Sequence, residues 1–228
     1  MQVGSLIASG RDCHIFEAGT GKVVRRARDG RNLEREASVM RHARRHGFPA
    51  PEVFDAEGPD ILMERVEGAN LMEHGLREPS RMRAHGRLLA DLLRRLAAVR
   101  APGWLPAAEG CPGNSLLHLD LHPLNVLVTG DGPKVIDWAN AGRGAAGADV
   151  ACTWLAMATA PVSGPDEEAG RDVVLAAFLE SIDREAARPY LSALAGRRLA
   201  DRNTRPGERA DIDRLVARET TERREPVS

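Results

Sequence analysis

The residues best suited to chemistry lie in one stretch, LLHLDLHPLNVLVTGDGPKVIDWANAG, at positions 116–142. It holds two isolated acids, Asp120 and Asp137, with Asn125 between them and apolar runs beside both acids. Carboxylate and amide oxygens are ligands that Mg²⁺ prefers, and water and phosphate oxygens complete its shell. Phosphoryl transfer needs such a metal, together with a carboxylate that orients the attacking hydroxyl and takes its proton. These residue types therefore indicate phosphoryl chemistry.

A short strand pair must position these residues. Pro123 keeps the segment after Asp120 from becoming helical, and Asn125 leads directly into the strand pattern VLVTG. The turn DGP then returns the chain through KVID to Asp137. Because a hairpin brings the outer ends of its strands together, Asp120, Asn125 and Asp137 are predicted to converge at one end of it.

The first thirty residues predict short strands joined by tight turns, and a helix follows over residues 31–47. The apolar stripe of this helix, at spacing i, i+3, i+4 and i+7, collects Leu33, Glu36, Ala37 and Met40. An acid on a buried stripe needs a cationic partner. Glu36 is therefore expected to form an ion pair.

The remaining elements complete an α+β pattern. Two strands around a Gly-Pro turn lead to the polar hinge EGANL, and mainly helical segments follow, over residues 80–99, 148–160, 165–183 and, more weakly, 189–200. Strands with one helix, then a hinge, then helices with an inserted strand pair predict two lobes. We place the lobes at residues 1–67, which would bind nucleotide, and 68–228, which carries the catalytic and metal loops.

Composition excludes several classes of protein. A net charge of −1 and a pI near 6.7 provide no broad basic field for nucleic acid. The three cysteines are scattered without a CxxC pair, which argues against a disulfide scaffold or a structural zinc site. No leader and no long apolar run is visible, so a cytoplasmic protein without membrane contact is expected, as a monomer or homodimer. Basic residues are almost all arginine, with lysine at positions 22 and 134 alone.

The pattern HxDxxxxN, followed by a strand and IDW, resembles the catalytic and metal loops of the aminoglycoside phosphotransferase family, small-molecule relatives of the protein kinases. The resemblance runs from about Ser5 to Ala160. It implies a two-lobed protein-kinase-like fold, with a small N-terminal antiparallel sheet plus one helix and a mainly helical C-terminal lobe with a β-hairpin. It also implies ATP and Mg²⁺ as cofactors and a small-molecule hydroxyl compound as substrate.

The resemblance assigns roles to the residues of the motif. Asp120 matches the catalytic base, and Asn125 and Asp137 match the metal ligands. Glu36 matches the helix glutamate that pairs with a basic residue on the third strand. Asp149, in GADVA, resembles the acid that supports the catalytic loop.

The nucleotide contacts implied by the resemblance lie in the N-terminal lobe. ILMERVEG resembles the stretch that joins the lobes, so Met63 would back the adenine, and Glu64 and Val66 would offer backbone groups to its edge. SGRDCH, with Ser9 and Gly10, stands where the phosphate-covering loop belongs.

Two departures from the family pattern concern the phosphates. The third strand reads KVVRRA, so an arginine stands where a lysine is usual. Strand phase permits Arg25 or Arg26, and strand order favours Arg25, which leaves Arg26 to point to water. A guanidinium can still pair with Glu36 and contact phosphate, although it is a bulkier, forked group than a lysine ammonium. The covering loop has Gly10 but no GxGxxG, so few backbone amides are available.

Two features of the sequence have alternative interpretations. His118 and His122 form an HxDxH cluster that could ligate zinc, but no further Cys or His cluster completes a site, so His118 is assigned to orienting the catalytic loop. The acids of segment 166–168 begin a predicted helix, where they cap it or hold a cationic substrate.

The sequence thus predicts an ATP-dependent phosphotransferase that moves the γ-phosphate to a hydroxyl of a small molecule, aminoglycoside-like or another metabolite. ATP and GTP are not distinguished. The alternative is a nucleotide-binding, pseudokinase-like regulatory module, suggested by the absent lysine and the short last lobe. The intact Asp120, Asn125 and Asp137 argue against that alternative.

Overall fold

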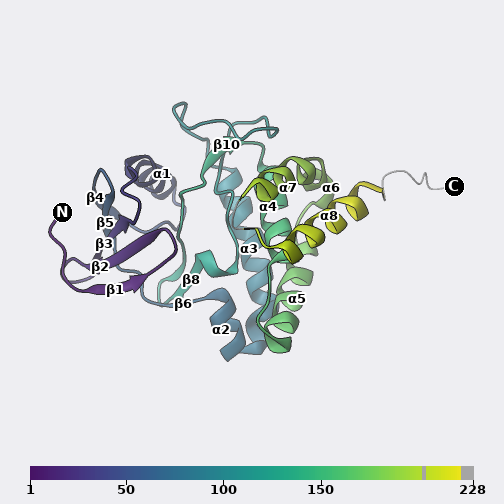
Figure 1. Cartoon of the computed structure of the whole chain (residues 1–228), viewed down its shortest axis with the longest axis horizontal. Coiled ribbons are helices and arrows are strands. Elements are labelled where there is room, and N and C mark those ends of the chain that lie inside the picture. The colour runs from purple at the N-terminus through teal and green to yellow at the C-terminus, as the bar shows by residue number, and fades with distance from the viewer. Residues whose placement is uncertain (202–203, 222–228) are drawn as a thin grey trace. The chain divides into compact units, whose positions relative to one another are not determined.

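The computed structural model describes residues 1–201 and 204–221, and these form two compact units. The first unit comprises residues 1–69 and 126–141, and the second comprises residues 70–125 and the described residues from 142 onward (Figure 1). Strands dominate the first unit and helices the second. The predicted α+β class is therefore confirmed, and the lobe boundary at residues 67/68 stays a prediction.

Five antiparallel strands build the sheet of the first unit, in the order β1-β2-β3-β5-β4. The strands are β1 (Leu6–Ser9), β2 (Cys13–Glu17), β3 (Lys22–Ala27), β4 (Val53–Glu57) and β5 (Asp60–Glu64). The central strand β3 places Arg25 opposite Ile15 of β2 and Ile61 of β5. The residue that the sequence matched to the family lysine therefore lies in the middle of the sheet.

Helix α1 (Glu34–Arg45) packs against β4 and β5. Its buried face carries Glu36 together with Ala37, Val39, Met40 and Ala43, as the apolar stripe predicted. The helix begins three residues later than expected, because the Asn32 side chain accepts the Glu34 N–H at 2.7 Å and holds the preceding residues in a turn.

A hairpin of β8 (Val126–Thr129) and β9 (Gly132–Val135) also belongs to the first unit, and β6 (Ala69–Asn70) pairs with β8. The Val135 N–H donates to Pro49 O at 2.8 Å, and the Trp138 ring meets Phe48 edge to face. The Lys134 Nζ donates to both Glu64 oxygens, at 2.8 and 2.9 Å. These contacts fix the segment that ends at Asp137 against the sheet.

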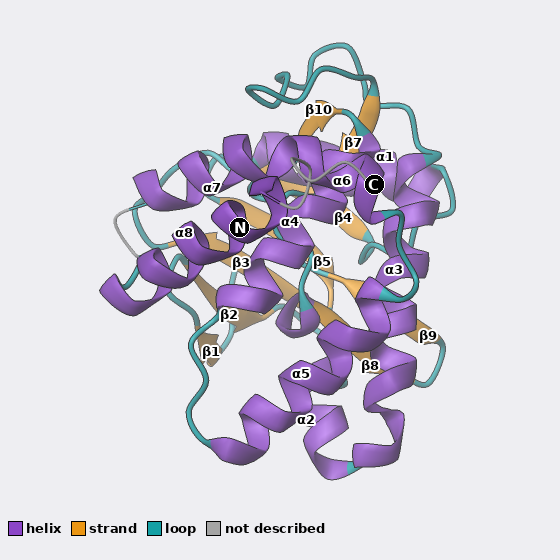
Figure 2. Cartoon of the chain, turned by 90° about the vertical axis from the view of Figure 1, so that its right-hand side faces the viewer, coloured by secondary structure: helices purple, strands orange, loops and turns teal. Residues whose placement is uncertain are grey.

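Helices make up most of the second unit (Figure 2). They are α2 (Leu71–Arg77), α3 (Met82–Ala97), α4 (Ala146–Thr159), α5 (Pro165–Leu179), α6 (Arg184–Ala187), α7 (Leu191–Ala200) and α8 (Pro206–Thr221), with the strand pair β7 (Ser115–Leu117) and β10 (Gly142–Gly144). Helices α3 and α5 lie side by side and close together at Gly86, where a Cβ would come within 2.3 Å of Val174 O. Helix α4 packs against α3, α5, α6, α7 and α8.

Helix α8 was not expected from the sequence, in which charges dominate beyond Asp201. Its Glu219 is 2% exposed and accepts hydrogen bonds from Arg184 and Arg188, each at 3.1 Å. A buried carboxylate is tolerated when it is paired in this way. The arginines thus hold the end of α8 against the rest of the unit.

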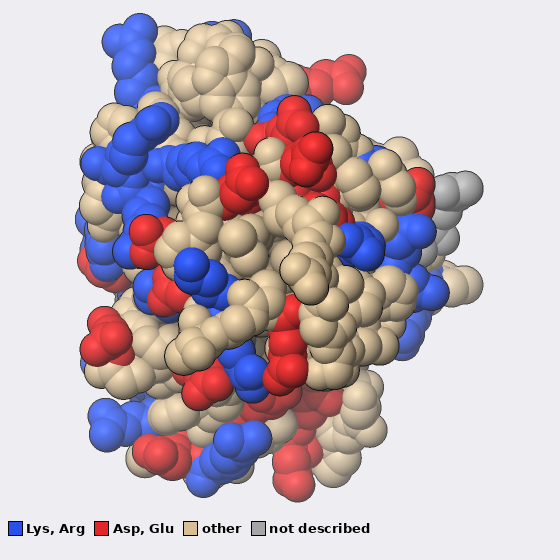
Figure 3. All heavy atoms as spheres, turned by 90° about the vertical axis from the view of Figure 1, so that its left-hand side faces the viewer, with Lys and Arg blue, Asp and Glu red and all other residues tan. Residues whose placement is uncertain are grey.

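Charged side chains of both signs lie on the surface of the molecule. On the face drawn in Figure 3, Lys and Arg side chains lie among Asp and Glu side chains. Within the described ranges, no helix combines the length and the apolar character that a membrane span requires.

Candidate active site

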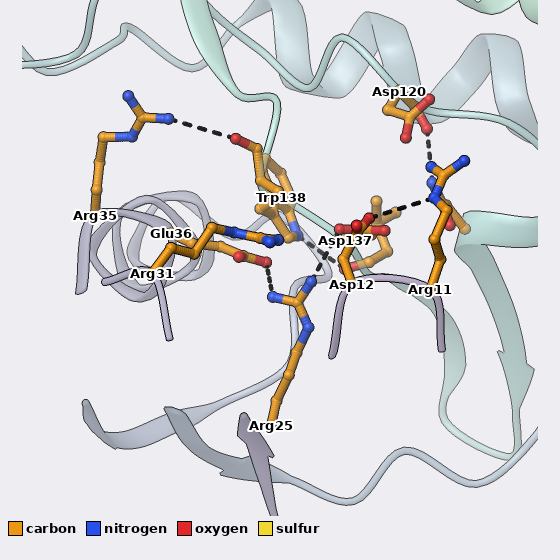
Figure 4. A network of polar contacts seen from close by, with 12 residues as sticks. Arg11, Asp12, Arg25, Arg31, Arg35, Glu36, Asp120, Asp137 and Trp138 are labelled. Atoms are coloured by element: carbon orange, nitrogen blue, oxygen red, sulfur yellow. Dashed lines mark hydrogen bonds and ion pairs between the residues drawn. The ribbon is translucent and has the colours of Figure 1, made fainter. Parts of the chain in front are cut away.

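Arg25, Glu36 and Asp137 form a partly buried polar group in the first unit (Figure 4). The Arg25 Nη1 donates to Glu36 Oε1, and its Nη2 donates to Asp137 Oδ1 at 3.1 Å. The side chains of Arg25 and Glu36 are 12% and 5% exposed, whereas that of Asp137 is 43% exposed. The predicted pairing of Glu36 with Arg25 is confirmed.

The two carboxylates of this group stabilise the charged form of Arg25. Burial alone would lower the pKa of Arg25, but the neighbouring carboxylates Glu36 and Asp137 raise it above its ordinary value. Burial also raises the pKa of the Cys13 thiol, so this cysteine is expected to remain protonated. The guanidinium is therefore a permanent positive charge next to Asp137.

Arg26 does not point to water as expected. Its Nε and Nη2 donate to the two oxygens of Asp60, both at 2.6 Å, and the Asp60 side chain is 5% exposed. The hydrogen bonds from Arg26 lower the pKa of Asp60. The two neighbouring arginines thus pair with different buried acids, because successive side chains of a strand point to opposite faces.

Two non-glycine residues in the described part of the chain have a positive φ, one in the segment that resembles a catalytic loop and one in the segment that resembles a metal loop. Leu119 has φ of 58° and Asp137 has φ of 63°. Such left-handed backbone is costly for residues with a Cβ and persists where the surroundings enforce it. Both positions are therefore under local constraint.

Helix α4 holds the loop that carries Asp120 in the second unit. The two oxygens of Asp149 accept the N–H groups of His118 and Leu119, at 2.8 and 2.7 Å. From the same helix face, Cys152 Sγ donates to Leu119 O at 3.2 Å and Thr153 Oγ1 to Leu121 O at 2.7 Å. The sequence analysis named Asp149 but missed the other two, although their spacing of i+3 and i+4 from Asp149 indicates one face.

Asp149 gives a testable dependence of stability on pH. Burial raises the pKa of its carboxyl to about 6, although the hydrogen bonds from His118 and Leu119 oppose the shift. The folded protein thus binds this proton more tightly than the unfolded chain does, because an aspartate in the unfolded chain titrates at about pH 4. The resulting stabilisation is complete below that pH and is lost as the pH rises through about 6.

Across this window we expect the wild-type free energy of unfolding to fall by about 3 kcal/mol relative to that of Asp149→Asn. Denaturant titrations of both proteins at a series of pH values measure the difference, because the Asn variant lacks the titrating group. Parallel profiles for the two proteins would assign the titration to another residue.

Asn125 presents an oxygen rather than a nitrogen for further binding. Its side chain is buried, and its Nδ2 donates to Asp120 O at 2.9 Å, which leaves Oδ1 as the available atom. The next residue, Val126, pairs with Val135, two residues before Asp137. His118, also assigned to the catalytic loop, is fully buried.

The residues matched to nucleotide contacts all lie in the first unit. Ser9 ends β1, and its Oγ lies 3.1 Å from His14 Nδ1. The Gly10 N–H donates to Cys13 O at 2.9 Å, so this amide already has a partner within the turn. Met63 is buried, and the Glu64 N–H donates to Glu52 O at 2.8 Å.

A polar hollow of about 810 Å³ lies beside the stretch that follows β5. It is lined by residues 64–67, which include Val66, by the β2–β3 turn and by the β8–β9 turn. Arg25, Glu36 and Asp137 do not line this hollow. We therefore do not assign it to the phosphate groups of a nucleotide.

The acids that begin α5 have local partners. Glu167 accepts the Ser163 N–H at 2.8 Å, which is the capping role expected for this segment. Glu168 lies 3.7 Å from the guanidinium of Arg171. Glu167 and Glu168 thus have partners at or next to the start of the helix.

The sequence matches the phosphotransferase enzyme family over residues 3–110 and 111–197, which is most of the chain. The chain belongs to this family. No match was found among curated proteins. Membership makes the chain a small-molecule phosphotransferase, as the resemblance of the motif predicted.

Solved structures share the fold of this phosphotransferase. The apo form of a thermostable mutant of aminoglycoside phosphotransferase APH(4)-Ia is 18% identical, with 98% of this chain and 96% of that chain covered and a TM-score of 0.69. A choline/ethanolamine kinase family protein from Mesorhizobium loti is 18% identical, with 98% and 89% covered and a TM-score of 0.59. ADP-bound APH(2'')-Ib is 13% identical, with 95% and 93% covered and a TM-score of 0.61. These likenesses confirm the kinase-like fold.

Each unit of the phosphotransferase carries an oxygen donor of a type that metal ions bind. Among residues 1–201 and 204–221, no group of three or more His, Cys, Asp or Glu side chains is placed to hold a metal ion. Mg²⁺ takes one or two protein ligands and completes its shell with water and phosphate oxygens. The exposed carboxylate of Asp137 and the free Oδ1 of Asn125 are of the type that suits such an ion.

Proposed function

We propose that this phosphotransferase transfers the γ-phosphate of ATP to a hydroxyl group of a small molecule, with Asp120 as the residue that orients the hydroxyl and takes its proton. The observation that carries the proposal is the loop before Asp120. Its backbone is fixed on both sides of Leu119 by Asp149 and Cys152 of a buried helix. A base that must lie within hydrogen-bond reach of its substrate benefits from such fixed backbone.

Asn125 and Asp137 would hold Mg²⁺, and their oxygens fit it for the reasons given above. When bound, the ion neutralises the charge of the transferring phosphoryl group. Asn125 is oriented for this role because its Nδ2 is bonded to Asp120 O. Asp137 Oδ1 accepts a hydrogen bond from the Nη2 of Arg25 at 3.1 Å.

Arg25 would contact the phosphates, and Glu36 would hold its guanidinium in place. Ser9 and Gly10 would cover the phosphates, although the Gly10 amide is engaged in its turn. Because the Glu64 N–H already donates to Glu52 O, Glu64 would offer its carbonyl oxygen to adenine, next to Met63 and Val66. The structure of a related enzyme, APH(2'')-IIa, contains ATP together with streptomycin, which supports ATP as the phosphate donor.

The acceptor is to be identified by a panel of hydroxyl compounds, with ADP release as the measurement. Structures with this fold include a complex with streptomycin, a complex with hygromycin B and a choline/ethanolamine kinase family protein. The local partners of Glu167 and Glu168 do not favour a polycationic acceptor. Turnover of a neutral or anionic compound, with none for any aminoglycoside, would exclude an aminoglycoside acceptor.

Mg-ATP is expected to raise the melting temperature of the wild type, and Asp137→Ala should lose most of this increase. A ligand that binds the folded state alone adds RT ln(1 + [L]/Kd), about 2.7 kcal/mol at a hundred times Kd. Thermal melts with and without Mg-ATP provide the measurement, and Asp131→Ala, an exposed acid of the same hairpin, is the matched control. An undiminished increase in Asp137→Ala would remove Asp137 from the metal site.

A further inference from the structure

One guanidinium is shared between two carboxylates at the proposed site. Nη1 of Arg25 donates to Glu36 Oε1, and Nη2 donates to Asp137 Oδ1 at 3.1 Å (Figure 4). Asp137 is also the residue that would hold a divalent cation. Its charge is thus already matched by a protein side chain, which must affect how strongly it binds metal.

Glu36 leaves room for a second arrangement of the same arginine. Its Oε2 is buried and accepts no hydrogen bond from any residue that the structure describes, although buried carboxylate oxygens are normally bonded. A guanidinium can bind one carboxylate through two parallel hydrogen bonds. If Arg25 turned both Nη atoms to Glu36, Oε2 would gain a donor and Asp137 Oδ1 would be released.

The two arrangements differ by the exchange of one hydrogen bond. In the bridging arrangement, which the structure shows, Arg25 contacts both acids. In the alternative arrangement Arg25 would be bonded twice to Glu36, and the half-exposed Asp137 would be free for solvent or a cation. The loss at Asp137 is offset by the gain at a buried oxygen that has no other donor among the described residues.

We propose that Arg25 controls divalent-cation binding at Asp137 by this exchange, with the bridging arrangement opposing the cation and the alternative arrangement admitting it. The inference rests on the proposed function, because it takes Asp137 as a metal ligand. Two positive groups compete for one carboxylate, so the cation binds the released state better and shifts the population toward it. A lysine ammonium lacks the planar pair of donors, so the exchange is a property of the arginine.

The test measures Mn²⁺ binding in the absence of nucleotide, from the electron paramagnetic resonance signal of the free ion. In Arg25→Lys, the single side-chain nitrogen is expected to pair with the more buried Glu36, which releases Asp137. Mn²⁺ should therefore bind at least about fivefold more tightly than it binds to wild type. In Glu36→Gln, the carboxylate that competes with Asp137 for the Arg25 guanidinium is lost, so Arg25 stays bonded to Asp137. Mn²⁺ should then bind more weakly, so the two variants shift the affinity in opposite directions.

Arg26→Lys is the matched control, because Arg26 pairs with Asp60 and not with the site. It should leave Mn²⁺ affinity unchanged, and a melt of each variant establishes that it is folded. Glu36→Gln carries the test if Arg25→Lys does not fold. Unchanged Mn²⁺ affinity in the folded Arg25 and Glu36 variants, with loss of binding in Asp137→Asn, would overturn the exchange alone. Undiminished binding in Asp137→Asn would overturn the proposed metal site and the exchange with it.

Discussion

Asp120→Asn is expected to lower turnover by about 10²–10⁴-fold while nucleotide binding is retained. The amide keeps the size of the side chain but cannot take the proton of the attacking hydroxyl, and general base catalysis contributes a factor of this order. The measurement is the rate of ADP release with an acceptor from the hydroxyl panel, or with water as the acceptor in slow ATP hydrolysis. Asp131→Asn, on an exposed turn, should retain wild-type turnover.

Nucleotide binding by the same variants separates chemistry from folding. The melting-temperature increase with Mg-ATP should be the same for wild type and Asp120→Asn, since Asp120 is not assigned to the metal or the phosphates. Wild-type turnover in Asp120→Asn would rule out Asp120 as the base. It would also require a different residue to orient the acceptor.

Arg25→Ala is expected to destabilise the protein by about 3–5 kcal/mol, the cost of leaving a buried acid without its partner. Glu36 is 5% exposed, and one of its oxygens is already without a donor among the described residues. The variant should also lose most of its response to Mg-ATP, because a contact to the phosphates is removed. Arg25→Lys should be milder in both respects, since an ammonium satisfies Glu36 as a point charge. Denaturant titration and melts with Mg-ATP measure the two effects.

Arg26→Ala is the informative comparison, because it too removes a guanidinium from a buried acid, although the Met1 ammonium still lies 3.3 Å from Asp60 Oδ2. Asp60 loses two hydrogen bonds of 2.6 Å, so the variant should be less stable than wild type. Its increase in melting temperature with Mg-ATP should nevertheless be retained, because Asp60 has no assigned role in binding phosphate. Loss of the nucleotide response in Arg26→Ala and its retention in Arg25→Ala would reverse the assignment of the two arginines.

The pairing of Glu36 was predictable because helical periodicity depends on neighbouring residues alone. The position of Glu36 on an apolar stripe required a cation, and the third strand supplied two candidates. The choice between Arg25 and Arg26 was not predictable with certainty, since KVVRRA does not alternate cleanly between apolar and polar residues. The partner of Arg26, a buried Asp60 at the start of β5, becomes visible when the strand register is known.

The features that the sequence did not reveal depend on contacts between distant segments. Helix α8 reads as a charged tail, yet Glu219 is buried because Arg184 and Arg188 come from elsewhere in the chain. The segment that leads to Asp137 contacts Pro49 and Phe48 in the connection between α1 and β4, about ninety positions earlier in the sequence. Cys152 and Thr153 look like ordinary helix residues until the catalytic loop is placed beside them.

The ion pair between Lys134 and Glu64 has a practical consequence for labelling. The chain has lysines at positions 22 and 134 alone, so reagents that modify side-chain amines have two targets. Lys22 lies over the Phe54 ring, whereas the Lys134 side chain is 16% exposed and bonded to both Glu64 oxygens. Reductive methylation of Lys134, followed by mass spectrometry with Lys22 as the internal reference, therefore reports how often the hairpin that carries Asp137 separates from the sheet.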